Sequence, residues 1–305
     1  MKYQFIDKHR SRYPVLDTCA ALEVNPSGYY DWKTRPPSNR EMEDAVLKDE
    51  ISSLHKQSRD SYGYRPMHGH LKEQEFTCGR DRTLRLMGEL GLEGTQKKGF
   101  KPQATDSNHS FGYSPNLLAK HGNPSSCDEA WVADTTYLKT EEGWCYLATV
   151  MDLYSRRILG WSVSSRNDSS LVCRALEAAV LTRGGQMPAG ICHHSDRGST
   201  YACDKYTRLV QQYRMQPSMS RKGNCYDNAA MESFFGRYKL CSVKGRQFAN
   251  ETEARANAFD YIEMFYNRFR KHSSLGYKSP IQFETMVSES QTGSQRLQPA
   301  CITNN

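Results

Sequence analysis

The order of apolar patterns after residue 130 constrains the fold of this chain more than any other feature. Apolar and β-branched residues form three strand-like runs at 132–138, 144–151 and 157–163. A turn at 141–143 joins the first two, and an amphipathic helix capped by Asn167 or Asp168 follows the third. Strand-like patterns then alternate with helical ones, at 191–194, 203–213, 215–219, 227–240 and 251–270.

Three strands followed by alternating helices and strands is the order of a ribonuclease-H-like fold. We therefore predict an α/β core at residues 129–287, with a mixed five-stranded sheet and helices, including a C-terminal helix. In that fold the first and fourth strands are neighbours at the centre of the sheet. Residues near the ends of these two strands are thus expected to come together.

Short helical patterns precede this core. Residues 1–35 have a helix-turn-helix outline, and residues 36–98 carry further helical segments. The last of these displays Arg80, Arg82 and Arg85, so we expect all-helical DNA-binding modules here, although a solvated basic surface explains the same pattern. Residues 99–128, rich in Gly, Pro, Ser and Asn, are expected to form a linker, and residues 288–305 a disordered tail.

Composition narrows the class of protein. Of the 305 residues 37% are hydrophobic and 25% are charged, which is ordinary for a globular chain. No apolar run approaches the ~20 residues of a membrane helix, and the N-terminus lacks a signal-peptide pattern, so we expect a cytoplasmic protein. Ten cysteines without a Cys-x-x-Cys pair disfavour a zinc ribbon and a disulfide scaffold.

Basic residues gather in one part of the chain. The formal net charge is +7, and residues 205–246 hold nine Lys or Arg but only two acids, Asp227 and Glu232. A positive field around an acidic site suits a polyanionic substrate. A solvated basic surface is the alternative.

Three acids stand out as candidate catalytic residues. Asp134 lies in the first strand-like run, Asp196 just beyond the fourth, and Glu232 in the helix after the fifth. An unpaired carboxylate in an apolar strand is costly, and a bound cation removes that cost. Because hard oxygen ligands favour Mg²⁺ or Mn²⁺, we expect two such ions about 3.5–4 Å apart over a phosphodiester. Each acid taken singly also fits a structural role: an arginine partner for the first, a turn for the second and a solvated helix position for the third.

Other polar residues are weighed against these acids. Asp152 ends the second strand and is interpreted as a turn residue rather than a metal ligand. His193 and His194 lack a matching second pair, which disfavours zinc. Asn228 shares a helix face with Glu232, and Lys239 follows that acid by two helical turns, where it is expected to hold a DNA phosphate unless it is a solvated cation.

Long motifs resemble those of one family. The chain resembles the second-frame product (OrfB) of IS-three family bacterial insertion sequences, which carry an integrase catalytic core. The resemblance covers about Met1 to Glu284 and rests on segments 27–32, 61–65, 149–161, 194–199, 220–235 and 266–280. Two departures are Pro66, where a second basic residue is usual, and the tail from Ser288, which matches nothing. Retroviral integrases have a similar triad but add an N-terminal zinc module, which this sequence lacks.

The resemblance implies a transposase of the DDE type, with its acidic triad at Asp134, Asp196 and Glu232 and its basic residue at Lys239. It implies cleavage that frees a 3′-hydroxyl, followed by transfer of that hydroxyl into DNA, usually by copying out a circular intermediate and pasting it in. DNA contacts are further expected from Arg197, Arg221, Lys222 and Asn224. Implied partners are element ends, target DNA and a first-frame product (OrfA), often fused to this chain by frameshifting. Synapsis of two ends predicts a homo-oligomer on DNA, and the resemblance implies a location at the bacterial nucleoid.

Two other functions are compatible with the residues. A non-catalytic DNA-binding regulator would bind element ends without metal-dependent chemistry. A ribonuclease-H-type nuclease would degrade hybrids, but the helical modules before the core favour DNA.

Overall fold

The computed structural model describes residues 1–95, 113–220 and 228–296, which fold as two compact units, Met1–Ile51 and Ser52–Asn305. Of the linker expected at 99–128, residues 99–112 lie outside the described residues, and the rest includes the short helix α7 (Leu118–His121). No helix among the described residues is long and apolar enough to span a membrane.

The first unit is helical. It contains α1 (Lys2–His9), α2 (Val15–Ala21), α3 (Pro26–Thr34) and the first part of α4 (Asn39–Gln57). Ile6, Cys19 and Tyr29 form its buried centre. The Asn25 side chain accepts a hydrogen bond from the Ser27 N–H and so caps α3. The turn between α2 and α3 lies where the sequence predicts it, and α1 packs against this pair through Ile6.

Two short helices begin the second unit. These are α5 (Tyr64–Glu73) and α6 (Arg80–Glu89), which pack on each other and bury Met67, Leu71, Leu86 and Met87.

Hydrogen bonds tie α5 to the C-terminal part of the same unit. The Tyr62 hydroxyl accepts from the Lys271 N–H at 2.7 Å and donates to the Phe269 carbonyl at 3.2 Å. The Lys271 ammonium pairs with Glu73 at the end of α5. Because Tyr62 and Lys271 are buried, these bonds hold α5 on the body of the unit.

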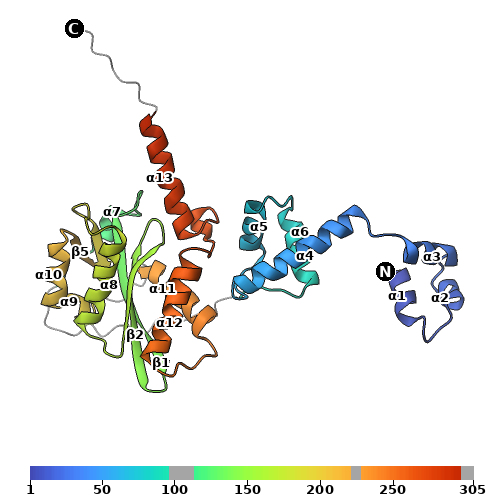
Figure 1. Cartoon of the computed structure of the whole chain (residues 1–305), viewed down its shortest axis with the longest axis horizontal. Coiled ribbons are helices and arrows are strands. Elements are labelled where there is room, and N and C mark those ends of the chain that lie inside the picture. Colours follow the sequence, from blue (N-terminus) through green and yellow to red (C-terminus); the bar gives the residue numbers. More distant parts are fainter. Residues whose placement is uncertain (96–112, 221–227, 297–305) are drawn as a thin grey trace, which may run out of the picture. The chain divides into compact units, whose positions relative to one another are not determined.

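A mixed five-stranded sheet forms the centre of this unit (Figure 1). Its strands are β1 (Ala130–Thr140), β2 (Gly143–Asp152), β3 (Ile158–Ser164), β4 (Cys192–Ser195) and β5 (Gln216–Met219). The order is β3-β2-β1-β4-β5, with β1, β2 and β3 antiparallel and with β4 parallel to both β1 and β5. The predicted ribonuclease-H-like α/β core is thus confirmed, including the contact between the first and fourth strands.

Alternating side chains of β1 bury both faces of the sheet. Trp131 and Ala133 pack in the cluster formed with α8 (Ser169–Thr182) and α10 (Asp204–Gln212). Val132 and Leu138 point the other way, toward α11 (Ala229–Tyr238) and α12 (Glu251–Phe259). Strand β1 is therefore held between two helical layers, which fixes the direction of its polar side chains.

Close packing of α8 on β3 requires a glycine. A Cβ atom at Gly160 would lie 2.2 Å from the Ala175 carbonyl oxygen and 2.3 Å from the Ala179 nitrogen. At the start of α8, the Asp168 side chain accepts from the Leu171 N–H, as the sequence predicts.

The C-terminal region differs from the prediction. The helix expected over 251–270 consists of α12 and a π-helical segment that ends at Tyr266. The disordered tail expected from Ser288 is wrong in part, because α13 (Pro280–Arg296) continues to Arg296. The remaining short elements are α7 (Leu118–His121), α9 (Ser199–Ala202), a π-helical segment Lys239–Val243 and a 3₁₀ turn Ser273–Leu275.

Candidate active site

Asp134 lies on the central strand β1, with both carboxylate oxygens occupied. Oδ1 accepts the Thr135 N–H at 2.8 Å, and Oδ2 accepts the side-chain amide of Asn228 at 2.9 Å. The next residue is also held, because the Thr135 hydroxyl lies 2.9 Å from the Tyr201 hydroxyl. These contacts fix the position of the carboxylate.

Asp196 follows β4, the parallel neighbour of β1. Paired residues are Ala130 with Cys192 and Val132 with His194, so the same register continued along both strands brings Asp196 beside Asp134. The Asp196 Oδ1 accepts the Gly198 N–H at 2.9 Å, which fixes the carboxylate at the start of the following loop. The two aspartates therefore come together by strand pairing.

Glu232 lies in the first turn of α11. Its neighbours Met231, Phe234 and Phe235 are buried against the sheet, whereas Glu232 itself is exposed. The helix thus presents the carboxylate on its outer side while its apolar side packs in the core.

The three acids interact electrostatically. Burial first, then the charge of Asp196 and to a smaller extent that of Glu232, raise the pKa of Asp134 to about 7, although hydrogen bonds from Thr135 and Asn228 oppose the shift. A carboxyl that is costly to ionise beside two more carboxylates is stabilised by a cation. The Oδ1 atom of Asn228 is buried and has no partner among the described residues. This set of hard oxygen donors fits Mg²⁺ or Mn²⁺.

Asn228 contacts Asp134, which the sequence does not predict. Asn228 stands at the N-cap position of α11, but its side chain makes no capping bond and donates to Asp134 instead. Its spacing from Glu232 indicates a shared helix face. Its bonding partner, 94 positions earlier in the chain, becomes evident only from the fold.

Lys239 directly follows α11. Its ammonium lies 4.2 Å from the ring centroid of Tyr137 on β1. Burial lowers the pKa of Lys239, and the charge of Asp134 opposes that shift. The lysine is thus half-buried and within electrostatic reach of the acids, as its spacing from Glu232 suggests.

The other basic residues expected to contact DNA fall in three places. Arg197 donates to the Ser220 carbonyl at 2.8 Å, and its guanidinium lies over the Tyr113 ring. Three predicted contacts lie outside the described residues, Arg221, Lys222 and Asn224. Three more lie on α6, where Arg80 and Arg85 are exposed and Arg82 is half-buried. Arg85 pairs with Glu89 one turn later.

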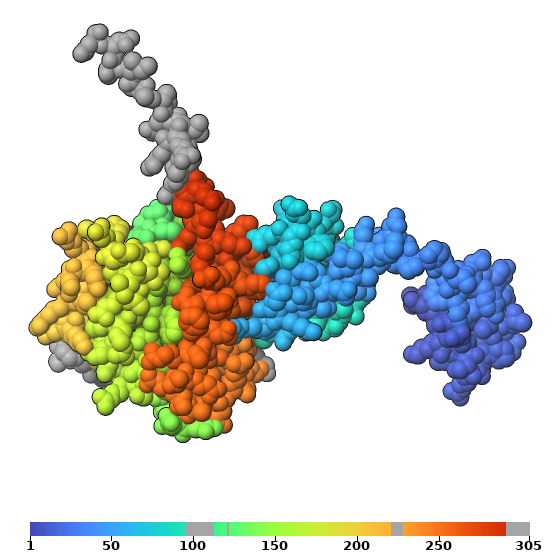
Figure 2. All heavy atoms as spheres, viewed as in Figure 1, coloured from blue at the N-terminus to red at the C-terminus, as the bar shows by residue number. Residues whose placement is uncertain are grey.

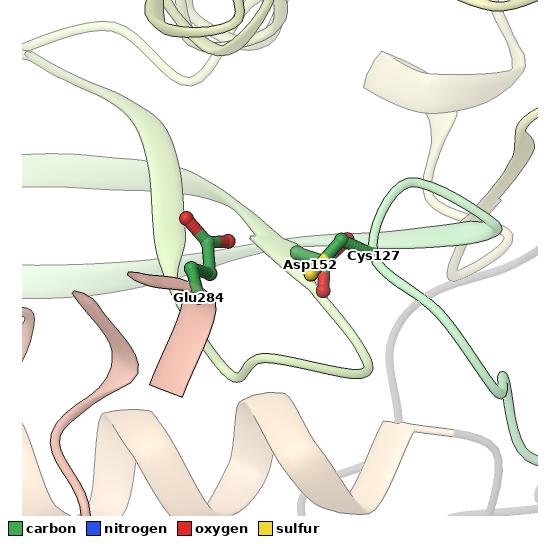
Figure 3. A group of neighbouring side chains, drawn as sticks. All are labelled: Cys127, Asp152 and Glu284. Carbon is green, nitrogen blue, oxygen red and sulfur yellow. The ribbon is translucent and has the colours of Figure 1, made fainter. Parts of the chain in front are cut away.

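Asp152 belongs to a different cluster. Ligand atoms of Cys127, Asp152 and Glu284 lie within 4.8 Å of one another, the one such group of three among the described residues (Figure 3). Asp152 is buried and accepts the N–H groups of Asp128 and Ser155 at 2.7 Å each, which agrees with the predicted turn role.

Arginines neutralise this cluster without a metal. Arg183 donates to both oxygens of Glu284 at 2.7 and 2.9 Å, and Arg157 donates to the same carboxylate at 2.6 Å. Burial, together with the charges of Asp152 and Glu284, raises the pKa of Cys127 to about 12, so its thiol stays protonated. A protonated thiol and saturated carboxylates are poor metal ligands, and the cluster is an ion-pair network that fixes α13.

The adjacent histidines of β4 are buried in the protein core. His193 lies 2.6 Å from the Tyr206 hydroxyl, and His194 lies 2.8 Å from the Ser218 hydroxyl. Both rings are buried on opposite faces of a short strand, and burial lowers the pKa of His193 to about 3. The neutral ring of His193 and the buried ring of His194 are therefore packing residues with polar partners.

Family models match most of the chain. Residues 125–225 and 213–280 match two models of an integrase core domain, and residues 41–100 match the model of an HTH-like domain. The first two matches contain all three acids, Lys239 and both aspartate-bearing strands.

Similar proteins extend over nearly the same length. The chain is 36% identical over 286 residues to the transposase InsF for insertion sequence IS3A of Escherichia coli (strain K12), covering 93% of this chain and 98% of that protein. It is 44% identical over 265 residues to the insertion element IS600 uncharacterized 31 kDa protein of Shigella sonnei, covering 87% and 96%.

Solved structures give lower similarity. The HTLV-2 integrase catalytic core domain in complex with magnesium aligns with a TM-score of 0.38 and 15% identity, over 52% of this chain and 98% of that one. The catalytic core domain of BIV integrase aligns with a TM-score of 0.38 and 13% identity, over 54% and 99%.

Proposed function

This chain belongs to the IS3 family of insertion-sequence transposases with an integrase catalytic core, and we propose that Asp134, Asp196 and Glu232 are its catalytic acids. The observation that carries the proposal is the parallel pairing of β1 and β4, which places two aspartates side by side. The charge of Glu232 acts on the same carboxylate. The resemblance of the sequence motifs to those of the family supports the same three residues.

The proposed site holds two Mg²⁺ or Mn²⁺ ions through these three acids. When bound, the ions would activate the attacking oxygen and stabilise the leaving oxygen of a phosphodiester. Asn228 orients the Asp134 carboxylate by donating to Oδ2, and Thr135 holds Oδ1. Lys239 offers a positive charge near the acids for a DNA phosphate.

Two displacement steps make up the proposed reaction. In the first, a water oxygen attacks phosphorus at the element end, and the bond from phosphorus to the 3′-oxygen breaks, which leaves a 3′-hydroxyl. In the second, that hydroxyl loses its proton and attacks a phosphorus of target DNA. A bond forms between the element's 3′-oxygen and this phosphorus, while the bond from the phosphorus to the target's own 3′-oxygen breaks and leaves a 3′-hydroxyl on the target. No covalent bond between protein and DNA is needed.

DNA contacts outside the acidic site are assigned to the helices before the core. Residues 41–100 match an HTH-like domain, and α6 carries Arg80, Arg82 and Arg85, which suit phosphate binding. Because α5 is bonded to the C-terminal part of its unit, DNA bound there is positioned relative to the acids. We further propose that a first-frame product and a second copy of this chain take part when two ends are synapsed.

A joining assay tests this proposal. Purified chain and labelled DNA carrying the element's own ends would be incubated with Mg²⁺ or with EDTA. We expect Mg²⁺-dependent cleavage and joining in the unmodified chain and in Asp204→Asn, which alters an exposed acid on α10. Asp134→Asn, Asp196→Asn and Glu232→Gln should lose both reactions while DNA binding is largely kept.

Two outcomes would redirect the assignment. Joining retained in Asp134→Asn would contradict the proposed triad. DNA binding without any products would favour the regulator function or a need for the first-frame region, and addition of that region separates these two.

A further inference from the structure

Two exposed aromatic rings lie on the β1–β2 hairpin near the acids. Tyr137 is 48% exposed and Trp144 is 51% exposed, although both belong to regular strands. Their ring centroids are 5.3 Å apart and the ring planes meet at 86°, an edge-to-face pair. The end of this hairpin, in green, emerges below the orange helices of the second unit (Figure 2).

The strand register places both rings on one face of the hairpin. Tyr137 pairs with Tyr146, and Lys139 pairs with Trp144, so these four side chains point the same way. Tyr146 packs against the core, whereas Tyr137 and Trp144 continue the row into solvent. A row that served only to stabilise the hairpin would not need two large rings that each keep about half of their surface in water.

On the edge of β1 away from β2, no described strand pairs with the stretch between Val132 and Thr140, where an isolated bridge joins Thr140 to Phe248. Among the described strands, β4 pairs with β1 only from Ala130 to Val132, and β1 extends to Thr140. Tyr137 comes three residues after Asp134, about 10 Å along the strand and on the other face of β1. Lys239 links the two sides, because it lies 4.2 Å from the Tyr137 ring centroid and feels the charge of Asp134. A polymer that reaches the acids along this edge would pass the rings.

Cations flank the two rings. The Lys239 ammonium lies 4.2 Å from the Tyr137 ring centroid, and the exposed Lys139 stands opposite Trp144. Aromatic faces next to ammonium groups match a single nucleic-acid strand, which presents bases for stacking and phosphates for charge pairing. An apolar protein surface bound to the rings would offer no negative charge to either lysine.

We propose that Tyr137 and Trp144 form a stacking surface for unpaired bases of the DNA strand that enters the acidic site. This inference rests on the proposed function and adds to it the residues that hold the strand end open. Tyr137 and Trp144 are positioning residues, because they contact bases rather than the reacting phosphate. Unpaired bases at the element terminus, separated from their complementary strand, are the ligand.

Binding of a single strand tests the proposal without chemistry. The full chain in EDTA would be titrated with a fluorescent oligothymidylate of about 12 nucleotides, within the usual range of single-strand sites. We expect Tyr137→Leu and Trp144→Leu each to weaken binding about tenfold, the value of one lost base stack. Trp144→Phe, which keeps an aromatic face, should stay within about twofold.

Matched measurements keep the result interpretable. Leu181→Ala alters another exposed apolar side chain, on α8, and should bind as the unmodified chain does. Thermal unfolding of each variant identifies any that fail to fold. Unchanged affinity in folded Tyr137→Leu and Trp144→Leu would overturn the proposal, as would loss of self-association in these variants with DNA binding intact.

The joining assay separates this inference from the proposed function. If the oligothymidylate depends on both rings but the unmodified chain shows no metal-dependent joining, the stacking surface stands and the proposed reaction fails. If joining occurs and is lost in Asp134→Asn, yet the leucine variants bind and join normally, the reaction stands and the stacking surface fails. The unmodified chain should bind an element end with mismatched terminal pairs more tightly than a fully paired end. The leucine variants should bind the two ends equally.

Discussion

Asp134 on β1 lies opposite Asp196, which directly follows the neighbouring parallel strand β4. The pairing of β1 with β4 runs from Ala130–Cys192 to Val132–His194, and the same register continued by two residues reaches the two aspartates. Neighbouring strands are about 4.8 Å apart, so the backbone itself brings the carboxylates together. Their proximity has a cost in the metal-free protein, and that cost can be measured.

Removal of the Asp134 charge should stabilise the metal-free protein. The pKa of Asp134 is raised to about 7 by burial first and by Asp196 next, whereas an unfolded aspartate titrates near 4. The folded state therefore prefers the protonated form, and its advantage is lost as pH rises from about 4 to 7. At pH 8 in EDTA, Asp134→Asn should raise the free energy of unfolding by about 2 kcal/mol, after allowance for solvent screening.

Urea unfolding at several pH values checks this expectation. The difference between Asp134→Asn and the unmodified chain should vanish near pH 4 and reach its full size above pH 7. Added Mg²⁺ should stabilise the unmodified chain and have little effect on the variant. A variant that is less stable than the unmodified chain at pH 8 would show that the carboxylate is compensated without a cation.

Replacement of Asn228 should lower the affinity of the site for Mg²⁺ more than it lowers the stability of the fold. Its amide donates to Asp134 Oδ2 at 2.9 Å, which orients a carboxylate assigned to the metal site. Loss of such an orienting partner typically costs 10–100-fold in metal affinity or activity, so Asn228→Ala should need roughly tenfold more Mg²⁺ for half-maximal joining. A Mg²⁺ titration of joining measures this. An unchanged Mg²⁺ requirement, with slower joining alone, would argue against an orienting role.

Lys239 should contribute one phosphate contact. It is half-buried beside the Tyr137 ring and feels the charge of Asp134. We expect Lys239→Gln to weaken binding of element ends and to reduce the slope of log affinity against log salt by about 0.9. Lys239→Arg keeps the charge and should preserve the slope. A loss of affinity that is equal at low and high salt would point to packing on Tyr137 instead.

The strand pattern of the core was predictable because alternation and apolar runs reflect burial directly. Trp131 and Val132 point to opposite faces of β1, and both are buried by helices. The family motifs added the positions of the acids and the expectation that the strands carrying them are neighbours. Strand order and register then follow from the fold.

Long-range polar contacts were not predictable from the sequence alone. The bond from Asn228 to Asp134 joins an amide and a carboxylate from two distant segments, and spacing along a helix gives a face but no partner. The exposure of Trp144 could not be predicted either, because aromatic residues in a strand usually indicate burial. The helix beyond Ser288 was missed because its sequence, which is mostly polar, lacks apolar periodicity.

Glu284 should anchor α13 through charge. Burial raises the pKa of Glu284, but hydrogen bonds and charge from Arg183, with further hydrogen bonds from Arg157 and Ser155, outweigh that effect and leave the pKa below its usual value. Its contribution to stability is thus present above about pH 4.5 and lost as pH falls through the lowered pKa. At pH 7, Glu284→Gln should cost about 2 kcal/mol because two half-buried arginines, Arg157 and Arg183, lose their counter-charge.

Chemical unfolding as a function of pH measures the contribution of Glu284. The penalty in Glu284→Gln should shrink toward pH 3, whereas Glu289→Gln, an exposed position on the same helix, should be neutral at every pH. An equal penalty at pH 3 and pH 7 would mean that shape rather than charge holds the helix.

Gly160 should be intolerant of a single added methyl group. A Cβ atom there would lie 2.2 Å from the Ala175 carbonyl oxygen and 2.3 Å from the Ala179 nitrogen, both backbone atoms of α8. Because backbone cannot rotate away as a side chain can, α8 would have to move off β3. Gly160→Ala should therefore lower the free energy of unfolding by about 3 kcal/mol. Gly88→Ala, in α6 with nothing within 4 Å of its added Cβ, should be neutral or stabilising by up to about 1 kcal/mol. Similar urea midpoints for the two variants would show that the packing of α8 on the sheet is looser than these contacts indicate.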